Sequence, residues 1–248
     1  MTLLKYRFTN DVLFKTVFAK EEEVLKRLVA AVLEVSVDEL EEFQVINPEL
    51  PPEENIEDKL LRLDINMLMR GRRVNLEVQV VDEKNYRERS LFNWARQFSS
   101  ALLAGHGYVE LPQVICINIL EFNLFGWKEF RSEFRIFDTE HYEVLSDKFG
   151  IHFFELPKLP KTVNVNSSEL VLLLALFHAK TEEELKHLNS LGVKSVTQLV
   201  ESYRRVTVSE EFRDLERRRE TTRHDLDNAL STARKEGREE GLQKGAQE

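Results

Sequence analysis

Two carboxylates, Asp64 and Glu77, stand where a short hairpin could bring them together. The stretch from Leu60 to Met69 is rich in apolar residues, Arg70-Gly71 is typical of a tight turn, and Val74 to Val81 alternates apolar with polar side chains. With a two-residue loop, antiparallel register sets Asp64 opposite Glu77. Directly opposed side chains lie roughly 5 Å apart at Cβ, so one Mg²⁺ ion could bind both. Such ions activate water for attack on a phosphodiester.

Other arrangements of the same hairpin remain open at this point. A register shifted by two residues would set Asp64 opposite Gln79, and the face assignment would survive because the period of a strand is two. The two acids could also lie on the solvated face of a half-exposed hairpin. Two uncompensated carboxylates held together repel each other, however, so their pairing makes most sense with a cation between them.

Helical spacing predicts the elements that must hold this hairpin in place. Thr9 or Asn10 can cap a helix that begins near Asp11 and is broken near residues 19–22. A long amphipathic helix follows the hairpin, and apolar runs typical of strands follow the helix. This order predicts an α/β fold with a central mixed sheet flanked by helices. The later elements are expected at residues 86–104, 114–120, 134–137 and 151–156.

The chain changes character after Pro157 and Pro160. Ser167 or Ser168, Thr181 and Ser195 each begin a short helical pattern, whereas the chain beyond them is highly charged. We therefore expect a main domain over residues 1–160 and a small helical appendage over residues 161–208. Residues 209–248 would form a charged helical tail that is a weak coiled coil, a frayed helix or disordered.

The charge of the chain limits how it could bind nucleic acid. A formal net charge of −9 argues against binding through bulk charge. The segment from Arg70 to Arg96, however, contains seven basic residues and four acidic ones, which makes it a local basic patch. Such a patch would bind phosphates in a salt-dependent way with little sequence information, although a solvated helix face would look the same.

Several classes of site and location are disfavoured. The single cysteine, Cys116, lies in an apolar run and can form neither a disulfide framework nor a thiolate metal site, which fits a reduced cytoplasm. We expect no signal peptide and no membrane span. The histidines lack metal-ligand spacing, and no phosphate loop or nucleophile elbow is present in the sequence. The carboxylate pair is thus the constellation with a chemical rationale.

Four separate segments resemble the PD-(D/E)XK nuclease family transposases, which are also described as recombination-promoting nucleases. The segments are Phe8 to Lys15, Asp58 to Ile65, Asn75 to Gln79, and Tyr86 to Ser90 with Gly107-Tyr108 beyond it. The resemblance covers about residues 5–160, and the ending Lys235 to Gly241 is also similar to tails in that group. It implies a restriction-endonuclease-like core and a DNA endonuclease that depends on Mg²⁺, for which Mn²⁺ can substitute.

The resemblance assigns roles to individual residues. Asp64 and Glu77 would be the catalytic metal ligands, and Gln79 stands where the motif usually has lysine. Glutamine is usual at this place in the group, but it supplies no charge, so the cationic role stays unassigned, with Lys15 and Lys59 as candidates. Asp11 matches an acidic residue that the first helix of such folds contributes. An aspartate there would also stabilise the start of the helix through its dipole.

The resemblance also implies DNA as the partner. Tyr86 and Arg89 match a family segment, and Arg72, Arg73 and Arg87 complete the expected DNA contacts. The C-terminal helical region could form a homodimer, so that two sites address both strands. The leading interpretation is a metal-dependent DNA endonuclease of the transposase-like type. The alternative is a nuclease-fold module that binds DNA or protein without efficient cutting.

Overall fold

The structure is a computed structural model that describes residues 1–46, 64–82, 84–101 and 107–245. Six strands form one mixed sheet in the order β1-β2-β3-β4-β6-β5. The pairs β3-β4 and β4-β6 are parallel, and the remaining pairs are antiparallel. The strands are β1 Gln44–Val45, β2 Asp64–Met69, β3 Arg72–Gln79, β4 Gln113–Leu120, β5 Arg131–Phe134 and β6 Phe149–Glu155.

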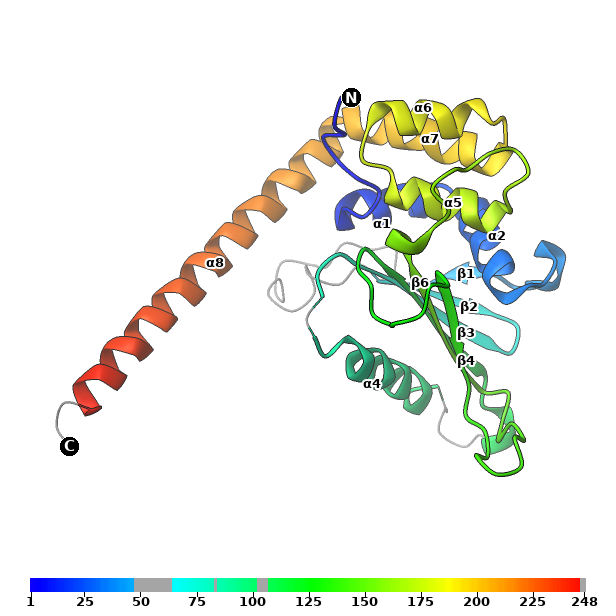
Figure 1. The fold of residues 1–248 in the computed structure, drawn as a ribbon, viewed down its shortest axis with the longest axis horizontal. Helices are drawn as coiled ribbons and strands as arrows, with labels where there is room; N and C mark the ends of the chain where they lie inside the picture. Colours follow the sequence, from blue (N-terminus) through cyan, green and yellow to red (C-terminus); the bar gives the residue numbers. More distant parts are fainter. Residues whose placement is uncertain (47–63, 83, 102–106, 246–248) are drawn as a thin grey trace.

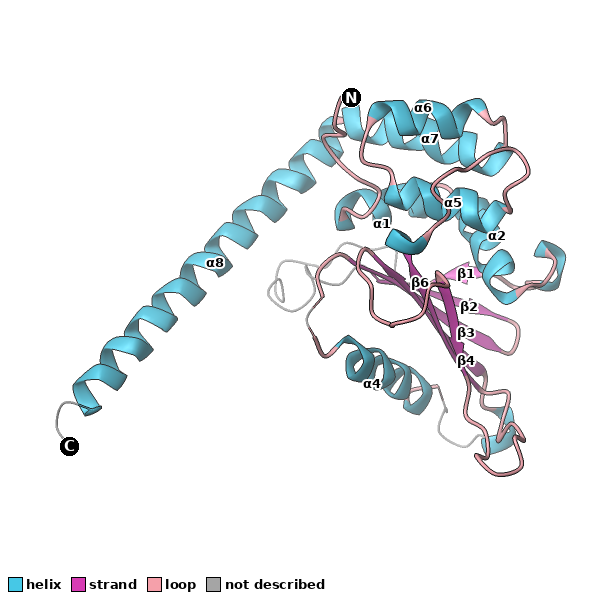
Figure 2. Ribbon diagram, in the orientation of Figure 1, coloured by secondary structure: helices cyan, strands magenta, loops and turns pink. Residues whose placement is uncertain are grey.

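Helices cover both faces of this sheet, which confirms the expected architecture (Figures 1 and 2). On one face lie α1 and α2 with α5, α6 and α7 beyond them, whereas α4 lies on the other face. The last helix, α8, starts beside α1 and α7 and leaves the body. The helices are α1 Asp11–Lys20, α2 Glu22–Leu33, α4 Tyr86–Ser99, α5 Glu169–His178, α6 Glu182–Ser190, α7 Lys194–Val208 and α8 Glu210–Gly245. Short 3₁₀ helices span Val37–Glu39, Tyr108–Glu110 and Leu156–Lys158.

The hairpin register is the one expected from the turn. Gly71 adopts a φ of 69°, a left-handed conformation that glycine tolerates, and Met69 pairs with Arg72 across the turn. Counting back, Asn66 pairs with Asn75 and Asp64 pairs with Glu77. The alternative register, with Asp64 opposite Gln79, is therefore excluded.

The helix starts follow capping chemistry. Asn10 accepts a hydrogen bond from the Leu13 amide at 2.8 Å, and Ser168 accepts one from the Val171 amide. Thr181 and Glu184 form a reciprocal capping box at the start of α6. The break predicted near residues 19–22 falls at Glu21, which separates α1 from α2. The long helix ends at Ser99, earlier than predicted, and β1 was missed because two residues carry no periodic pattern.

Two apolar cores lie on opposite faces of the sheet. The larger core joins the sheet to α1, α2, α5, α6 and α7. The smaller core joins Tyr86 and Trp94 of α4 to β4 and β6, through residues such as Cys116 and Phe153. On the α4 side, therefore, the apolar packing gathers over β4 and β6.

The predicted division at residue 160 falls between elements that share one core. Leu173 and Phe177 of α5 and Leu199 of α7 belong to the same cluster as Phe14 of α1. The N-terminal segment also crosses the division, because the Leu4 amide donates to the Lys180 carbonyl at 2.9 Å. The separate appendage remains a prediction.

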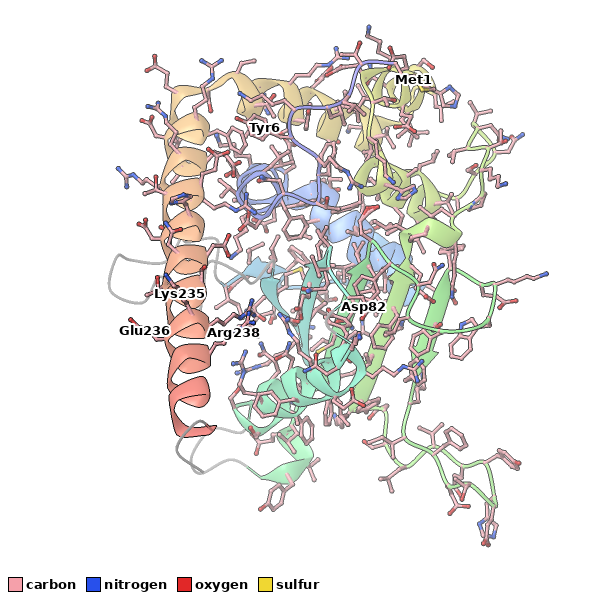
Figure 3. The ribbon with its side chains drawn as sticks, turned by 60° about the vertical axis from the view of Figure 1, so that its left-hand side comes forward. Met1, Tyr6, Asp82, Lys235, Glu236 and Arg238 are labelled. Carbon is pink, nitrogen blue, oxygen red and sulfur yellow. The ribbon has the colours of Figure 1, made fainter. Side chains whose placement is uncertain are left out.

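The tail helix has an anchored start and an exposed remainder. Phe212 is fully buried and meets the Tyr6 ring edge-on at 4.9 Å, close to where Figure 3 labels Tyr6. Beyond Arg223, all side chains whose exposure the structure describes are exposed, and Lys235, Glu236 and Arg238 mark this stretch in Figure 3. With 36 residues α8 is about 54 Å long at 1.5 Å per residue. No helix in the described parts is long and apolar enough to cross a bilayer.

Phe177 is the residue on which the larger core can be tested. Its ring is fully buried and stacks on Phe18 with centroids 5.8 Å apart. We expect Phe177→Ala to lower the free energy of unfolding by about 3–5 kcal/mol, because a large buried ring is replaced by a cavity. Chemical denaturation should show little change for Phe92→Ala, since that ring is 65% exposed. Equal effects of the two substitutions would contradict this packing.

Candidate active site

A row of polar side chains on α4 faces a row of polar side chains on the sheet. Arg89, Asn93 and Gln97 are spaced by four residues, so they share one side of the helix. Arg89 Nη2 donates to Glu77 Oε1 at 3.0 Å, and Asn93 Nδ2 donates to Glu77 Oε2 at 3.1 Å. Arg89 and Asn93 therefore hold both oxygens of one carboxylate.

The Glu77 carboxylate is buried, with 3% of its side chain exposed. A buried charge is costly unless it is paired and hydrogen-bonded, and the guanidinium of Arg89 provides that compensation. One turn further along, Gln97 Nε2 donates to Asn66 Oδ1 at 2.9 Å, and Asn75 Nδ2 donates to the same oxygen. The polar row thus continues from β3 onto β2.

Asn118 lies beside Glu77 on the neighbouring parallel strand and links three elements there. β4 pairs with β3 so that Asn118 lies opposite Glu77. The Tyr86 hydroxyl donates to Asn118 Oδ1 at 3.0 Å, and Asn118 Nδ2 donates to the His152 carbonyl at 3.1 Å. Asn118 is 1% exposed, so these bonds are made in the absence of competing bulk solvent.

The surroundings of Glu77 hold two further titratable groups in their neutral forms. Burial, followed by the nearby Glu77 charge, raises the pKa of Tyr86 well above its usual range. The same two causes raise the pKa of Cys116 to about 12. Neither group is therefore available as an anionic nucleophile near neutral pH.

Gln79 follows Glu77 by two residues on β3, and Asp64 lies on the neighbouring strand β2. The Gln79 side chain is buried, and its Nε2 donates to the Val81 carbonyl at 3.0 Å. Asp64 begins β2 directly across from Glu77. The register therefore brings the two expected metal-ligand positions together.

The residues expected at DNA lie in different environments. Arg73 lines a small hollow with Asn66 and Gln97 on the α4 side of the sheet, whereas Arg72 lines an open depression near the hairpin turn. Arg87 donates to the Leu124 carbonyl at 2.8 Å and lies over the Phe125 ring. Tyr86 is fully buried, which differs from the expectation of direct DNA contact: its hydroxyl supports Asn118 from behind.

Asp11 is held by the tail helix. Arg219 Nε lies 2.5 Å from Asp11 Oδ1, and Asn10 Nδ2 donates to Glu216 Oε1 at 3.1 Å. Burial raises the pKa of Glu216. α1 belongs to the helical layer on the other face of the sheet from α4, which carries Arg89 and Asn93, the partners of Glu77.

The site has partners that sequence reasoning missed. Asn93 could have been found from its spacing of four after Arg89, which places both on one face of α4. Asn118 lies within an apolar run, where one buried amide is a recognisable exception. No local pattern could indicate Arg219, because its partner Asp11 lies about 200 residues earlier in the chain.

The donor set suits a hard divalent cation better than a soft one. Carboxylate oxygens are what Mg²⁺ prefers, and Mg²⁺ commonly takes one or two protein carboxylates while it keeps several waters. The described side chains contain no group of three or more His, Cys, Asp or Glu that could form a closed metal cage. Glu77, with Asp64 opposite it, fits the open type of site.

A model of the PD-(D/E)XK nuclease family transposases matches residues 8–233. The chain belongs to this family. The match runs from before α1 into α8, so the family region includes α5–α7 and most of the tail helix. The mixed sheet with flanking helices is consistent with the restriction-endonuclease-like fold of PD-(D/E)XK proteins. In the same comparisons no curated protein and no solved structure matched the chain.

The hydrogen bond from Tyr86 to Asn118 can be tested with Tyr86→Phe. The substitution keeps the ring but leaves the buried Asn118 Oδ1 without its donor. We expect the free energy of unfolding to fall by about 1–3 kcal/mol, the cost of an unsatisfied buried acceptor. Tyr108→Phe is the matched control, because that side chain is 81% exposed. If urea denaturation gave the same stability for both variants, the bond would contribute nothing.

Proposed function

We propose that this protein is a metal-dependent DNA endonuclease of the transposase-like, recombination-promoting type. The observation that carries the proposal is the buried Glu77 carboxylate directly across from Asp64 in a member of a nuclease family. A buried acid with its own hydrogen-bonding shell is costly to maintain, which favours a functional role. Membership of the family and the register of the hairpin both support the assignment.

Asp64 and Glu77 would hold a Mg²⁺ ion, for which Mn²⁺ could substitute. When bound, such an ion supplies an activated water and neutralises charge on the phosphoryl group. Asn93 holds the Glu77 carboxylate, and Asn118 ties the neighbouring strand β4 to α4 and β6, so that the carboxylate need not reorganise when it binds the ion. Gln79 lies next in line on β3, where its amide is bonded to the backbone.

Positively charged side chains around this face would hold the DNA. Arg73 lies on the α4 side of the sheet, and Arg89 lies at the carboxylate itself. Arg72 and Arg87 would extend the contacts along the backbone of the duplex. Because such contacts address phosphates, binding should depend steeply on salt and weakly on sequence.

A module that binds DNA or protein without cutting is the second candidate. The observation that favours it concerns Gln79. This residue brings no charge where the motif usually has lysine, and its side-chain amide donates to the Val81 carbonyl. The two candidates differ in whether any cleavage depends on the acids.

Cleavage of supercoiled plasmid at low salt tests the proposal. We expect nicking or linearisation with Mg²⁺ or Mn²⁺ and none with EDTA. Glu77→Ala and Asp64→Ala should each lower the rate by at least ~100-fold, because each removes a ligand of the ion. DNA affinity measured in a gel-shift assay should stay within a few-fold.

Glu129→Ala removes an exposed acid before β5 and is the matched control. It should cut like the native protein. DNA binding with no metal-dependent cleavage by the native protein would reject the endonuclease and favour the binding module. Cleavage that survives both Glu77→Ala and Asp64→Ala would show that the site lies elsewhere.

We also propose self-association through the exposed stretch of α8. Phe212 and Leu215 of α8 already pack against the body, so a dimer formed by this helix would use the stretch beyond them. A chain ending at Thr222 keeps the anchored turns and should sediment as a monomer, whereas the full chain should sediment as a dimer. The same oligomeric state for both chains would contradict this proposal.

A further inference from the structure

The proposed nuclease site requires a positive charge that its motif does not provide. In phosphoryl transfer, a fixed cation near the reacting oxygens stabilises the charge that develops. Gln79 is neutral, and its amide nitrogen is committed to the Val81 carbonyl at 3.0 Å. A protein cation for this site would therefore come from another element.

The two lysines considered from the sequence do not fill this role in the described structure. Lys15 belongs to α1, in the layer on the opposite face of the sheet from α4. Since Glu77 meets Arg89 and Asn93 of α4, its carboxylate lies on the α4 side. Lys59 lies outside the described residues.

Arg89 lies at the carboxylate and is held in position. Its Nη2 is 3.0 Å from Glu77 Oε1, and its guanidinium carbon lies 5.8 Å from the centre of the Tyr86 ring. Tyr86 is itself fixed by its bond to Asn118. The Arg89 side chain is 24% exposed whereas Glu77 is 3% exposed, so the guanidinium lies between the buried acid and solvent.

We propose that Arg89 is the mobile cation of this site: it neutralises Glu77 until a divalent ion binds, and it then contacts the phosphate of the DNA. This inference rests on the proposed function. Arg89 and a metal ion would satisfy the same buried carboxylate, so they compete for it. Asn93 has no charge and can keep its bond to the other oxygen while the exchange takes place.

The geometry of the arginine side chain suits the proposed contact with the DNA phosphate. The guanidinium is planar, always charged and weakly hydrated, and it binds phosphate oxygens through two parallel N–H groups. Arg89 is on the first turn of a helix that is anchored by Tyr86 and Trp94, so the backbone can stay in place while the side chain turns. Arg89 would thus supply from α4 the charge that Gln79 lacks on β3.

Competition predicts opposite effects of one substitution on two measurements. Arg89→Met keeps the aliphatic length but removes the charge. Mn²⁺ affinity is measured by calorimetric titration of the protein without DNA. We expect Mn²⁺ to bind at least about tenfold more tightly, because the ion no longer has to displace Arg89 from Glu77. Plasmid cleavage should fall at least ~100-fold, because the phosphate loses its cation. A residue that only positioned Glu77 would give weaker metal binding when it was removed.

Two further variants keep the test interpretable. Arg89→Lys retains the charge without the planar fork, so Mn²⁺ affinity should stay near the native value while cleavage is partly restored. It also serves if Arg89→Met folds poorly, as thermal unfolding would reveal. Arg204→Met removes an exposed helical arginine from α7 and should change neither measurement.

The possible failures are distinguishable. Mn²⁺ binding that Glu77→Gln abolishes but Arg89→Met leaves unchanged or weakens would overturn the role of Arg89 and leave the metal site standing. No Mn²⁺ binding by the native protein or by Arg89→Met would overturn both. Tighter Mn²⁺ binding by Arg89→Met with no cleavage by the native protein would support the exchange at Glu77 and reject the endonuclease. Cleavage by the native protein that Arg89→Met leaves unchanged would overturn the phosphate contact.

Discussion

The buried charge of Glu77 is the constraint on which this half of the molecule depends. A carboxylate with 3% of its surface exposed must find compensation within the protein, and the compensation comes from α4. This requirement fixes the rotation of α4, since Arg89 and Asn93 must face β3. Tyr86 and Trp94, on another part of the helix, then pack over β4 and β6. The side of α4 that faces the sheet is therefore divided: its polar residues meet β3, and its apolar residues meet β4 and β6.

The sheet adds a second layer of fixation through its parallel strands. Asn118 connects Tyr86 of α4 to the backbone of β6, so one amide couples three elements at the site. The larger core on the opposite face is built around aromatic rings such as Phe14, Phe18 and Phe177. One face of the sheet thus carries the larger apolar core, and the other carries the proposed site.

Local patterns in the sequence were enough to predict the hairpin, because its turn and its period of two are encoded within twenty residues. Asp64 opposite Glu77 followed from counting back from Gly71. The mixed sheet and its flanking helices followed from the order of the elements. The bond from Tyr86 to Asn118 and the ion pair of Asp11 with Arg219 could not be predicted in this way. Both depend on how distant elements pack, and side-chain identity alone does not specify that.

The parallel pairing of β3 with β4 has a consequence for the order in which the molecule folds. The β2-β3 hairpin closes a short loop, whereas joining β3 to β4 requires a crossover that includes α4. Contacts distant in sequence form slowly, since loop entropy must be overcome before any of them is gained. Asp64, Glu77 and Arg89 come from one short stretch of chain, because Arg89 lies only 12 residues from Glu77, so bringing them together needs no long crossover. Asn118 comes from β4, so the parallel crossover adds this buried amide to a hairpin and a helix whose charged groups can already be paired.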